Sequence, residues 1–189
     1  MPKTRTFIAV EAADEVHAAA LAAIDRLRSA ATGIKWVEPD NLHWTLQFLG
    51  DLTDMEVAEV CLRTVRVAAE HEAFAVQARG VGAFPSIKRP RTLWLGAGEG
   101  AERLIALQAD VEQALSSLGF RGENRQFVPH LTLGRAGRNA DGGALLAQRL
   151  AKLADFDGGA MAVDAVTVFA SELGRDGPTY HVLARAPLS

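Results

Sequence analysis

The chain contains two copies of a four-residue motif, His-x-Thr-Leu. Residues 43–46 read His-Trp-Thr-Leu, and residues 130–133 read His-Leu-Thr-Leu. Random placement of the five histidines and ten threonines would give about 0.3 His-x-Thr triplets, and requiring leucine next lowers this to roughly 0.03. The copies lie about half a chain length apart. We therefore expect a single domain over residues 1–189, made of two duplicated lobes that carry one copy of the motif each.

Each copy of the motif has the composition of a β-strand, and side chains on a strand alternate between its two faces. His43 and Thr45 then share one face, and His130 and Thr132 share the corresponding face of the second strand. Trp44 and the leucines point to the cores behind. If the two strands lie opposite each other, two imidazoles and two hydroxyls converge on one site.

The spacing of apolar residues predicts an alternation of strands and helices along the whole chain. Helices are expected over 13–31, after a capping Thr53 with Glu56, over 101–118 and over 144–154. Strands are expected over 6–10, 35–37, 41–49, 74–81, 92–95, 128–134, 163–170 and 179–186. Loops are expected over 82–90, 120–127 and 135–143, with a turn around 174–178. This order predicts an α+β fold: two mostly antiparallel sheets that face a central groove, with helices outside.

Composition restricts the classes of protein to consider. The apolar fraction of 49% and the absence of any long apolar run indicate a globular chain without a membrane span. The single Cys61 cannot form an internal disulfide, which fits a reducing cytoplasm. A formal charge of −3 argues against broad nonspecific nucleic-acid binding but leaves room for a local basic cleft. We expect a cytoplasmic monomer.

Two histidines and two threonines suit one kind of chemistry. Imidazole transfers protons near neutral pH, so two of them supply one base and one acid. Threonine hydroxyls are compact hydrogen-bond donors for phosphate oxygens. The set suits attack by water on a phosphodiester without a metal or another cofactor. The rival interpretations are two structural histidines, or a metal site, which the lack of a neighbouring carboxylate disfavours.

These motifs and their surroundings resemble the 2H phosphoesterase superfamily, and more closely the RNA 2′,3′-cyclic phosphodiesterases historically called 2′-5′ RNA ligases. The resemblance covers almost the whole chain. Its matching segments are 5–10, 34–37, 41–50, 82–85, 90–94, 129–135 and 171–173, with Tyr180. Trp44 occupies a position that is often leucine in the family.

The resemblance implies that RNA ending in a 2′,3′-cyclic phosphate is hydrolysed to a 2′-phosphomonoester. It assigns His43 as proton donor to the departing 3′ oxygen and His130 as the base that activates water. Thr45 and Thr132 would hold the phosphate, and Arg135 would add a positive charge beside it. The reverse reaction would join RNA ends through a 2′-5′ linkage as a minor activity.

Several assignments stay open from the sequence. Phe48 is a candidate for stacking on an RNA base, but strict alternation places it on the core side unless a bulge intervenes; Phe7 has the same two interpretations, and core packing is favoured for both. The basic stretch 88–91 either contacts RNA or is a solvated loop. The alternative functions are a noncatalytic RNA-end binding module and a cyclic phosphodiesterase for small nucleotides. For the favoured function, tRNA fragments are among the candidate RNA partners.

Overall fold

A computed structural model describes residues 3–122, 125–175 and 177–189. The described chain forms these elements: β1 (Thr4–Glu11), α1 (Asp14–Arg28), β2 (Thr32–Trp36), the 3-10 helix η1 (Pro39–Asn41), β3 (His43–Leu52), α2 (Asp54–Ala68), β4 (Phe74–Phe84), β5 (Thr92–Ala97), α3 (Ala101–Ser116), β6 (His130–Asp141), α4 (Gly143–Lys152), β7 (Asp157–Val163), β8 (Ala165–Leu173) and β9 (Pro178–Pro187). The expected α+β class is confirmed. The expected connection over 120–127 and turn over 174–178 each include residues outside the described ranges.

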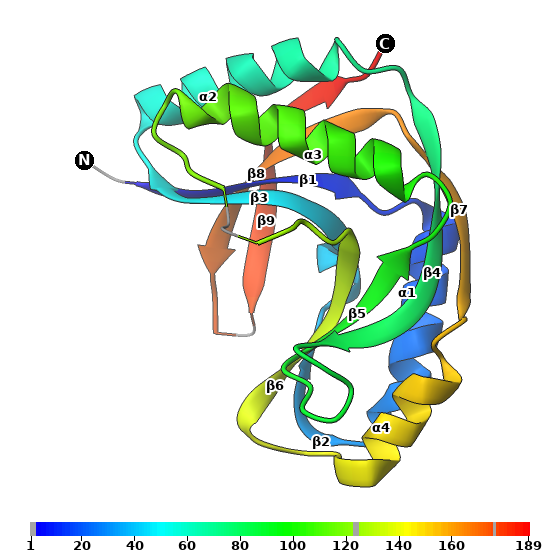
Figure 1. Cartoon of the computed structure of the whole chain (residues 1–189). Helices are drawn as coiled ribbons and strands as arrows, with labels where there is room; N and C mark the ends of the chain where they lie inside the picture. Colours follow the sequence, from blue (N-terminus) through cyan, green and yellow to red (C-terminus); the bar gives the residue numbers. More distant parts are fainter. Residues whose placement is uncertain (1–2, 123–124, 176) are drawn as a thin grey trace.

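The strands form one curled antiparallel sheet in the order β7-β4-β5-β6-β3-β1-β8-β9, with β2 paired to β6 (Figure 1). The two motif strands, β3 and β6, lie next to each other in the middle. They are paired only at Trp44 and Leu131. The two expected sheets are thus two halves of one sheet. We call β3, β1, β8 and β9 the first half-sheet, and β6, β2, β5, β4 and β7 the second half-sheet.

Helices cover one face of this sheet. Helices α2 and α3 pack together over the first half-sheet, and α1 and α4 pack over the second (Figure 1). In α1 the apolar residues that recur at helical spacing, Val16, Ala20, Ile24 and Leu27, are all buried against the sheet. The other face of the sheet carries no helix from the described part of the chain, and we call it the open face. No helix among the described residues is long and apolar enough to cross a membrane.

Helix α2 confirms one prediction and corrects another. Thr53 and Glu56 form the expected capping box. The helical spacing of its apolar residues predicts an inner stripe of Val57, Cys61, Val65 and Ala68, and this is correct only in part. Val57 and Cys61 pack partly buried against the core, but Val65 is 41% exposed. The fully buried residues are Val60, Thr64 and Ala68. Hydropathy alone excludes a threonine from a core. The Thr64 hydroxyl donates to the Val60 carbonyl at 2.8 Å, so its burial leaves no unsatisfied donor.

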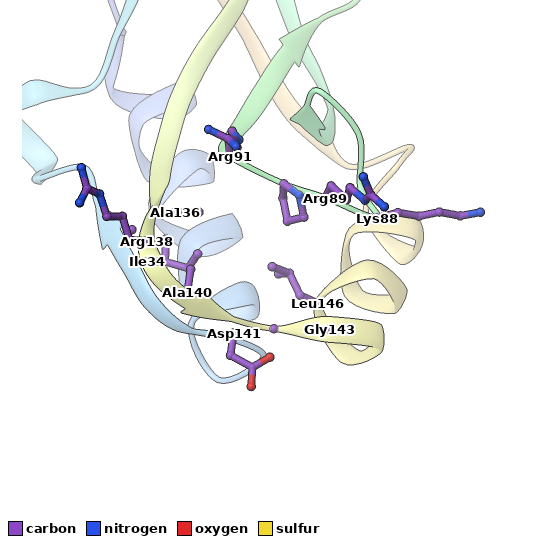
Figure 2. A pocket seen from close by; sticks show the side chains of 13 residues that line it. Ile34, Lys88, Arg89, Arg91, Ala136, Arg138, Ala140, Asp141, Gly143 and Leu146 are labelled. Atoms are coloured by element: carbon purple, nitrogen blue, oxygen red, sulfur yellow. The ribbon is translucent and has the colours of Figure 1, made fainter.

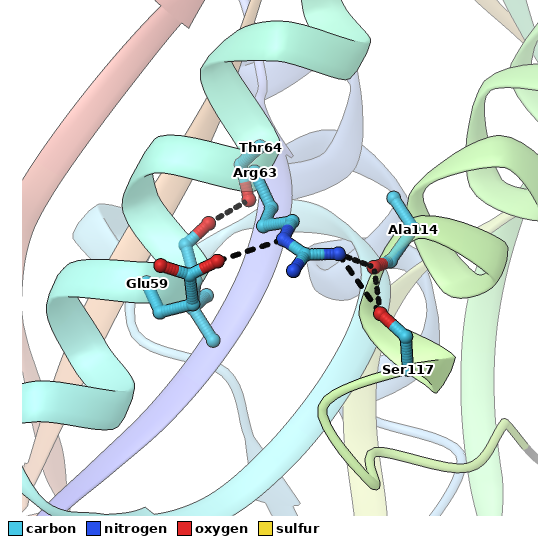
Figure 3. Close-up of polar contacts among 6 residues, drawn as sticks. Glu59, Arg63, Thr64, Ala114 and Ser117 are labelled. Carbon is cyan, nitrogen blue, oxygen red and sulfur yellow. Dashed lines mark hydrogen bonds and ion pairs between the residues drawn. The ribbon is translucent and has the colours of Figure 1, made fainter.

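A polar link joins α2 to α3 next to this stripe (Figure 3). The Arg63 guanidinium donates to Glu59 on its own helix at 2.8 Å. It also donates to the Ser117 hydroxyl at 2.8 Å and to the Ala114 carbonyl at 3.3 Å, at the end of α3. The two helices that cover the first half-sheet are therefore held in register at their solvent edge.

Several strands run further than their local sequence predicts. Residues 82–84 continue β4, and β6 extends to Asp141 through the expected loop 135–143. Strand β7 was not predicted. These segments are rich in glycine, and their strand structure depends on partners distant in sequence. At Gly134, a Cβ atom would lie 2.9 Å from the side chains of Ile34 and Trp36, so β2 can approach β6 only because that position has no side chain.

Candidate active site

The single residue pair between β3 and β6 organises the motif residues. Trp44 and Leu131 are paired and almost completely buried, at 1% and 0% exposure. Extending the antiparallel register by one residue on each side sets His43 opposite Thr132 and Thr45 opposite His130. All four side chains are partly exposed, and alternation directs them to the open face. The structure therefore brings the two predicted half-sites together.

Both motif strands contain a bulge at the same place. Along β3, Gln47 pairs with Ile8 but Thr45 pairs with Ala9, so Leu46 is an extra residue. Along β6, Gly134 pairs with Leu93 but Thr132 pairs with Trp94, so Leu133 is an extra residue. The burial patterns of the first nine residues of β3 and β6 are identical. A bulge re-aims the side chains that follow it.

The bulge decides where Phe48 and Arg135 point, since each lies five positions after its histidine. Phe48 is 60% exposed and lies against Phe7 on the open face, with ring centroids 5.8 Å apart. The favoured expectation of core packing is therefore wrong for Phe48. It is confirmed for Phe7, which is 2% exposed. Arg135 is exposed at the equivalent position of β6.

His43 lies in an aromatic enclosure. The ring centroid of Phe7 is 4.9 Å from that of His43, and Tyr180 presents its edge at 5.4 Å. Burial lowers the pKa of His43 to about 4, with smaller lowering contributions from the charges of Arg135 and His130, against the Asn41 backbone hydrogen bond, which raises it. His43 is therefore a neutral imidazole at pH 7.

The same backbone contact orients both imidazoles. His43 Nδ1 lies 2.7 Å from the Asn41 carbonyl oxygen, and His130 Nδ1 lies 2.8 Å from the Val128 carbonyl oxygen. A carbonyl oxygen only accepts, so Nδ1 carries a hydrogen in each ring. Nε2 is then the nitrogen that exchanges a proton with a substrate. The Phe84 ring meets His130 edge-on at 5.0 Å, as Phe7 and Tyr180 support His43.

The acidic side chain beside His43 is hydrogen-bonded to residues other than the histidine. Glu11 is the cross-strand neighbour of His43. Its carboxylate accepts two hydrogen bonds from Arg185, at 2.9 and 3.0 Å, and one from Thr167 at 3.1 Å. The Arg185 hydrogen bonds are the main cause that lowers the pKa of Glu11. The Glu11 carboxylate therefore links β1 to β8 and β9 through Thr167 and Arg185, and it forms no ion pair with the His43 imidazole.

The positive side of the site belongs to the second half-sheet. Arg135 Nη1 donates to the Thr92 hydroxyl at 3.3 Å. The charge of Arg135 contributes to lowering the pKa of His43, and it opposes the rise that burial causes in the pKa of Tyr180. A fixed guanidinium thus lies within electrostatic reach of both imidazole and phenol across the junction between the half-sheets.

A basic cavity begins one residue beyond Arg135 (Figure 2). Its volume is about 510 Å³, and its walls come from the loop before β5, the end of β6 and the start of α4. Its lining includes Lys88, Arg89 and Arg91 with a single acid, Asp141; Arg138 also lines it, but the Arg138 side chain points away from the cavity on the other side of β6 (Figure 2). The basic stretch 88–91 is thus gathered at one cavity, and its contact with RNA stays a prediction.

Sequence patterns did not predict every residue of the site. Phe169 stacks on Phe7 at 5.2 Å, and Tyr180 meets both Phe7 and His43. The Asn41 side chain donates to the Pro178 carbonyl at 2.7 Å, which ties the His43 segment to β9. These partners lie more than a hundred residues from the first motif, and only the resemblance pointed to Tyr180. Among the described residues, no group of three or more histidine, cysteine or acidic side chains is clustered as in a metal site.

Comparison with known proteins agrees with this geometry. The profile of the 2′-5′ RNA ligase superfamily matches residues 14–175. A protein of Aeropyrum pernix named RNA 2′,3′-cyclic phosphodiesterase is 38% identical over 162 residues, which are 84% of this chain and 90% of the relative. One of the same name from Methanothermobacter thermautotrophicus is 36% identical over 180 residues, 94% of this chain and 95% of the relative.

Solved structures show the same fold. A protein of Thermus thermophilus superposes with a TM-score of 0.75 at 32% identity, covering 97% of each chain. Escherichia coli LigT complexed with 3′-AMP superposes with a TM-score of 0.77 at 25% identity, covering 99% of each chain.

Proposed function

The chain belongs to the 2′-5′ RNA ligase superfamily, and from this membership we propose that it hydrolyses the 2′,3′-cyclic phosphate at the end of an RNA. It is an enzyme of the cyclic phosphodiesterase class. One observation supports the two-histidine mechanism above all others: two imidazoles with the same Nδ1 contact lie on either side of the Trp44–Leu131 pair.

In the proposed mechanism, His130 Nε2 removes a proton from water as the oxygen attacks phosphorus. The bond from phosphorus to the 3′ oxygen breaks, and His43 Nε2 donates a proton to that oxygen. The product is a 2′-phosphomonoester and a 3′ hydroxyl. Thr45 and Thr132 donate to the phosphate oxygens, and Arg135 balances their charge. All five side chains belong to β3 and β6.

The donor role of His43 requires a protonated imidazole, and burial disfavours that form. Its pKa of about 4 leaves it neutral at pH 7. A phosphodiester carries one negative charge, and an opposite charge next to an imidazole raises its pKa. We propose that substrate binding and protonation of His43 are coupled. The charged acid then exists mainly when a phosphate is present to accept its hydrogen bond.

Phe48 is the proposed platform for the terminal base. It is exposed, it lies on the open face with His43, and Phe7 supports its ring. Base stacking on an aromatic ring is the usual grip on unpaired RNA. The aromatic half of the site would then hold the base, while the cationic half holds phosphate.

The remaining proposals concern context. When an RNA 5′ hydroxyl replaces water as nucleophile, His130 removes the proton of that hydroxyl, the bond from phosphorus to the 3′ oxygen breaks and His43 protonates the departing oxygen. The product is a 2′-5′ bond, and we propose this joining as a minor activity. The chain is proposed to act as a monomer and in the cytoplasm, where its single cysteine would stay reduced. The proposed mechanism uses no metal, because the two imidazoles supply both the base and the acid. The Glu11 carboxylate beside His43 is hydrogen-bonded to Arg185.

The decisive experiment uses RNA that ends in a 2′,3′-cyclic phosphate and is labelled at its 5′ end, incubated with the protein in EDTA. We expect opening of the ring with a 2′-phosphate as the only product. A 3′-phosphate product would exchange the roles of His43 and His130. Loss of activity in EDTA that returns with a divalent ion would refute the metal-free mechanism, and tight binding without turnover would favour the noncatalytic alternative.

A further inference from the structure

Two cations lie side by side next to the site without an acid between them. Lys35 on β2 is the cross-strand partner of Arg135 on β6, and Thr92 on β5 is the partner on the other side. Cross-strand partners point to the same face, so Lys35, Arg135 and Thr92 form one row on the open face. Like charges directly opposite each other destabilise a sheet. This pair is therefore unfavourable unless something anionic covers it.

The described part of the chain does not supply that anion. Among the residues that the structure describes, Lys35, Arg91 and Arg138 form no ion pair and no side-chain hydrogen bond. Arginines elsewhere do, as shown by Arg63 with Glu59 at 2.8 Å and Arg185 with Glu11 at 2.9 Å. The whole chain has a net charge of −3, so uncompensated cations are concentrated here against the overall balance.

The unpaired cations continue along β6. Arg138 is exposed, three residues beyond Arg135, and Figure 2 shows its side chain on the opposite side of β6 from Lys88. Three residues of extended chain span about 10 Å, which is too far for one phosphate group to bridge. The Ala136 amide donates to the Arg91 carbonyl at 2.9 Å and fixes the cavity wall to the strand that carries Arg135.

We infer that Lys35 and Arg138, together with Arg135, form a second binding region that holds the sugar–phosphate backbone of the RNA upstream of its cyclic end. Contacts to successive phosphates require cations spread along a surface, which these side chains provide. The inference rests on the proposed function and adds to it a preference for RNA chains over single nucleotides. Lys35 and Arg138 are binding residues in this scheme and take no part in proton transfer.

The test compares two substrates: a mononucleoside 2′,3′-cyclic phosphate and an oligoribonucleotide with the same end. The double variant Lys35→Ala/Arg138→Ala should lower kcat/KM on the oligonucleotide by about tenfold more than on the mononucleotide. The slope of log KM against log salt should fall by about 1.4 for the oligonucleotide, about 0.7 for each lost phosphate contact. The melting temperature should not fall, because a like-charge pair is removed.

Lys152→Ala is the matched control, since it removes one exposed lysine from α4, behind the sheet. It should leave the ratio of the two kcat/KM values unchanged. An equal loss on both substrates, or an unchanged salt slope, would overturn the inference.

A binding measurement separates this inference from the proposed function. Anisotropy of a labelled oligonucleotide with a 3′-phosphate end reports affinity without chemistry. If the wild-type protein opens neither substrate, the proposed function fails. Weaker oligonucleotide binding by the double variant would still support the backbone region, and equal binding would refute it.

Discussion

The two half-sheets build the same backbone frame and line it with opposite chemistry. Each has a His-x-Thr-Leu strand, a bulge at its leucine and a histidine whose Nδ1 contacts a carbonyl two residues back. At the position that this bulge exposes, the first half-sheet has Phe48 and the second has Arg135. The shared frame therefore fixes where groups point, while a few side chains decide what each half does.

The neighbours of each motif strand extend this contrast. Around His43 the open face is aromatic, with Phe7, Phe169 and Tyr180 packed together. Beside Arg135 it is cationic, with Lys35 opposite. An aromatic enclosure strips water from an imidazole and favours its neutral form, whereas a cationic row attracts phosphate. The substrate would therefore lie across the junction, with its base over one half and its phosphates over the other.

The largest loss of activity should come from removing either of the two imidazoles. His43→Ala and His130→Ala should each lower kcat/KM on cyclic-phosphate RNA by about 10³-fold, since each removes one proton-transfer group. Circular dichroism should show an intact fold. His71→Ala, which removes an imidazole that contacts Asp110 in the helical layer, is the matched control and should stay active. Full activity in either active-site variant would end the acid–base assignment.

The second effect concerns the neutral His43. Its pKa is about 4 in the folded chain, against 6.5 for an ordinary histidine side chain, so between these values the unfolded chain binds more protons. Stability should therefore fall as pH drops from about 6.5 towards 4, by at most about 3 kcal/mol. Urea unfolding at pH 7 and pH 4.5 measures this loss. His43→Gln should show a smaller loss, and an equal loss in both proteins would contradict the neutral imidazole.

The third effect compares the two equivalent positions directly. Arg135→Ala should lower kcat/KM by about 30-fold, because it removes a charged phosphate contact, and should flatten the salt dependence. Phe48→Ala should lower it by about tenfold through lost stacking, with an unchanged salt dependence. Phe48→Tyr should restore most of the activity. Identical salt responses in the two alanine variants would show that the halves do not divide base and phosphate between them.

Much of this site followed from the sequence, because it depends on local periodicity. Alternation over three residues assigned His43 and Thr45 to one face and Trp44 to the core, and the structure agrees. The bulge has no local signature: it arises because β3 must match β1, and β6 must match β5, with one residue to spare. Phe48 was therefore placed on the wrong side by a rule that holds for regular strands.

Other errors share a tertiary cause. The end of β6 looks like a loop in sequence, because Gly137, Asn139 and Asp141 have low strand propensity, and pairing with β2 makes it a strand. Tyr180 and Phe169 reach His43 from β9 and β8, which join the sheet beside β1 at the far end of the chain. Helix α2 buries Thr64 because its hydroxyl bonds within the helix, which a hydropathy stripe does not register.

The smallest effect on activity should come from making the two His-x-Thr-Leu motifs identical. Trp44→Leu converts residues 43–46 to His-Leu-Thr-Leu, as in residues 130–133. The indole is buried beside Leu131, and its Nε1 has no hydrogen-bond partner among the described residues, so the loss of packing is partly offset by removal of an unsatisfied donor. We expect a stability loss of about 1–2 kcal/mol by urea unfolding, against about 3–5 kcal/mol for Trp44→Ala.

Activity of Trp44→Leu should stay within about twofold of wild type, since the side chain lies beneath the site and the catalytic groups keep their backbone contacts. The same cyclic-phosphate RNA assay measures it. A much larger loss of activity would show that the indole, through its bulk, sets the spacing of the two imidazoles, and that the first half-site cannot use the smaller support that serves the second.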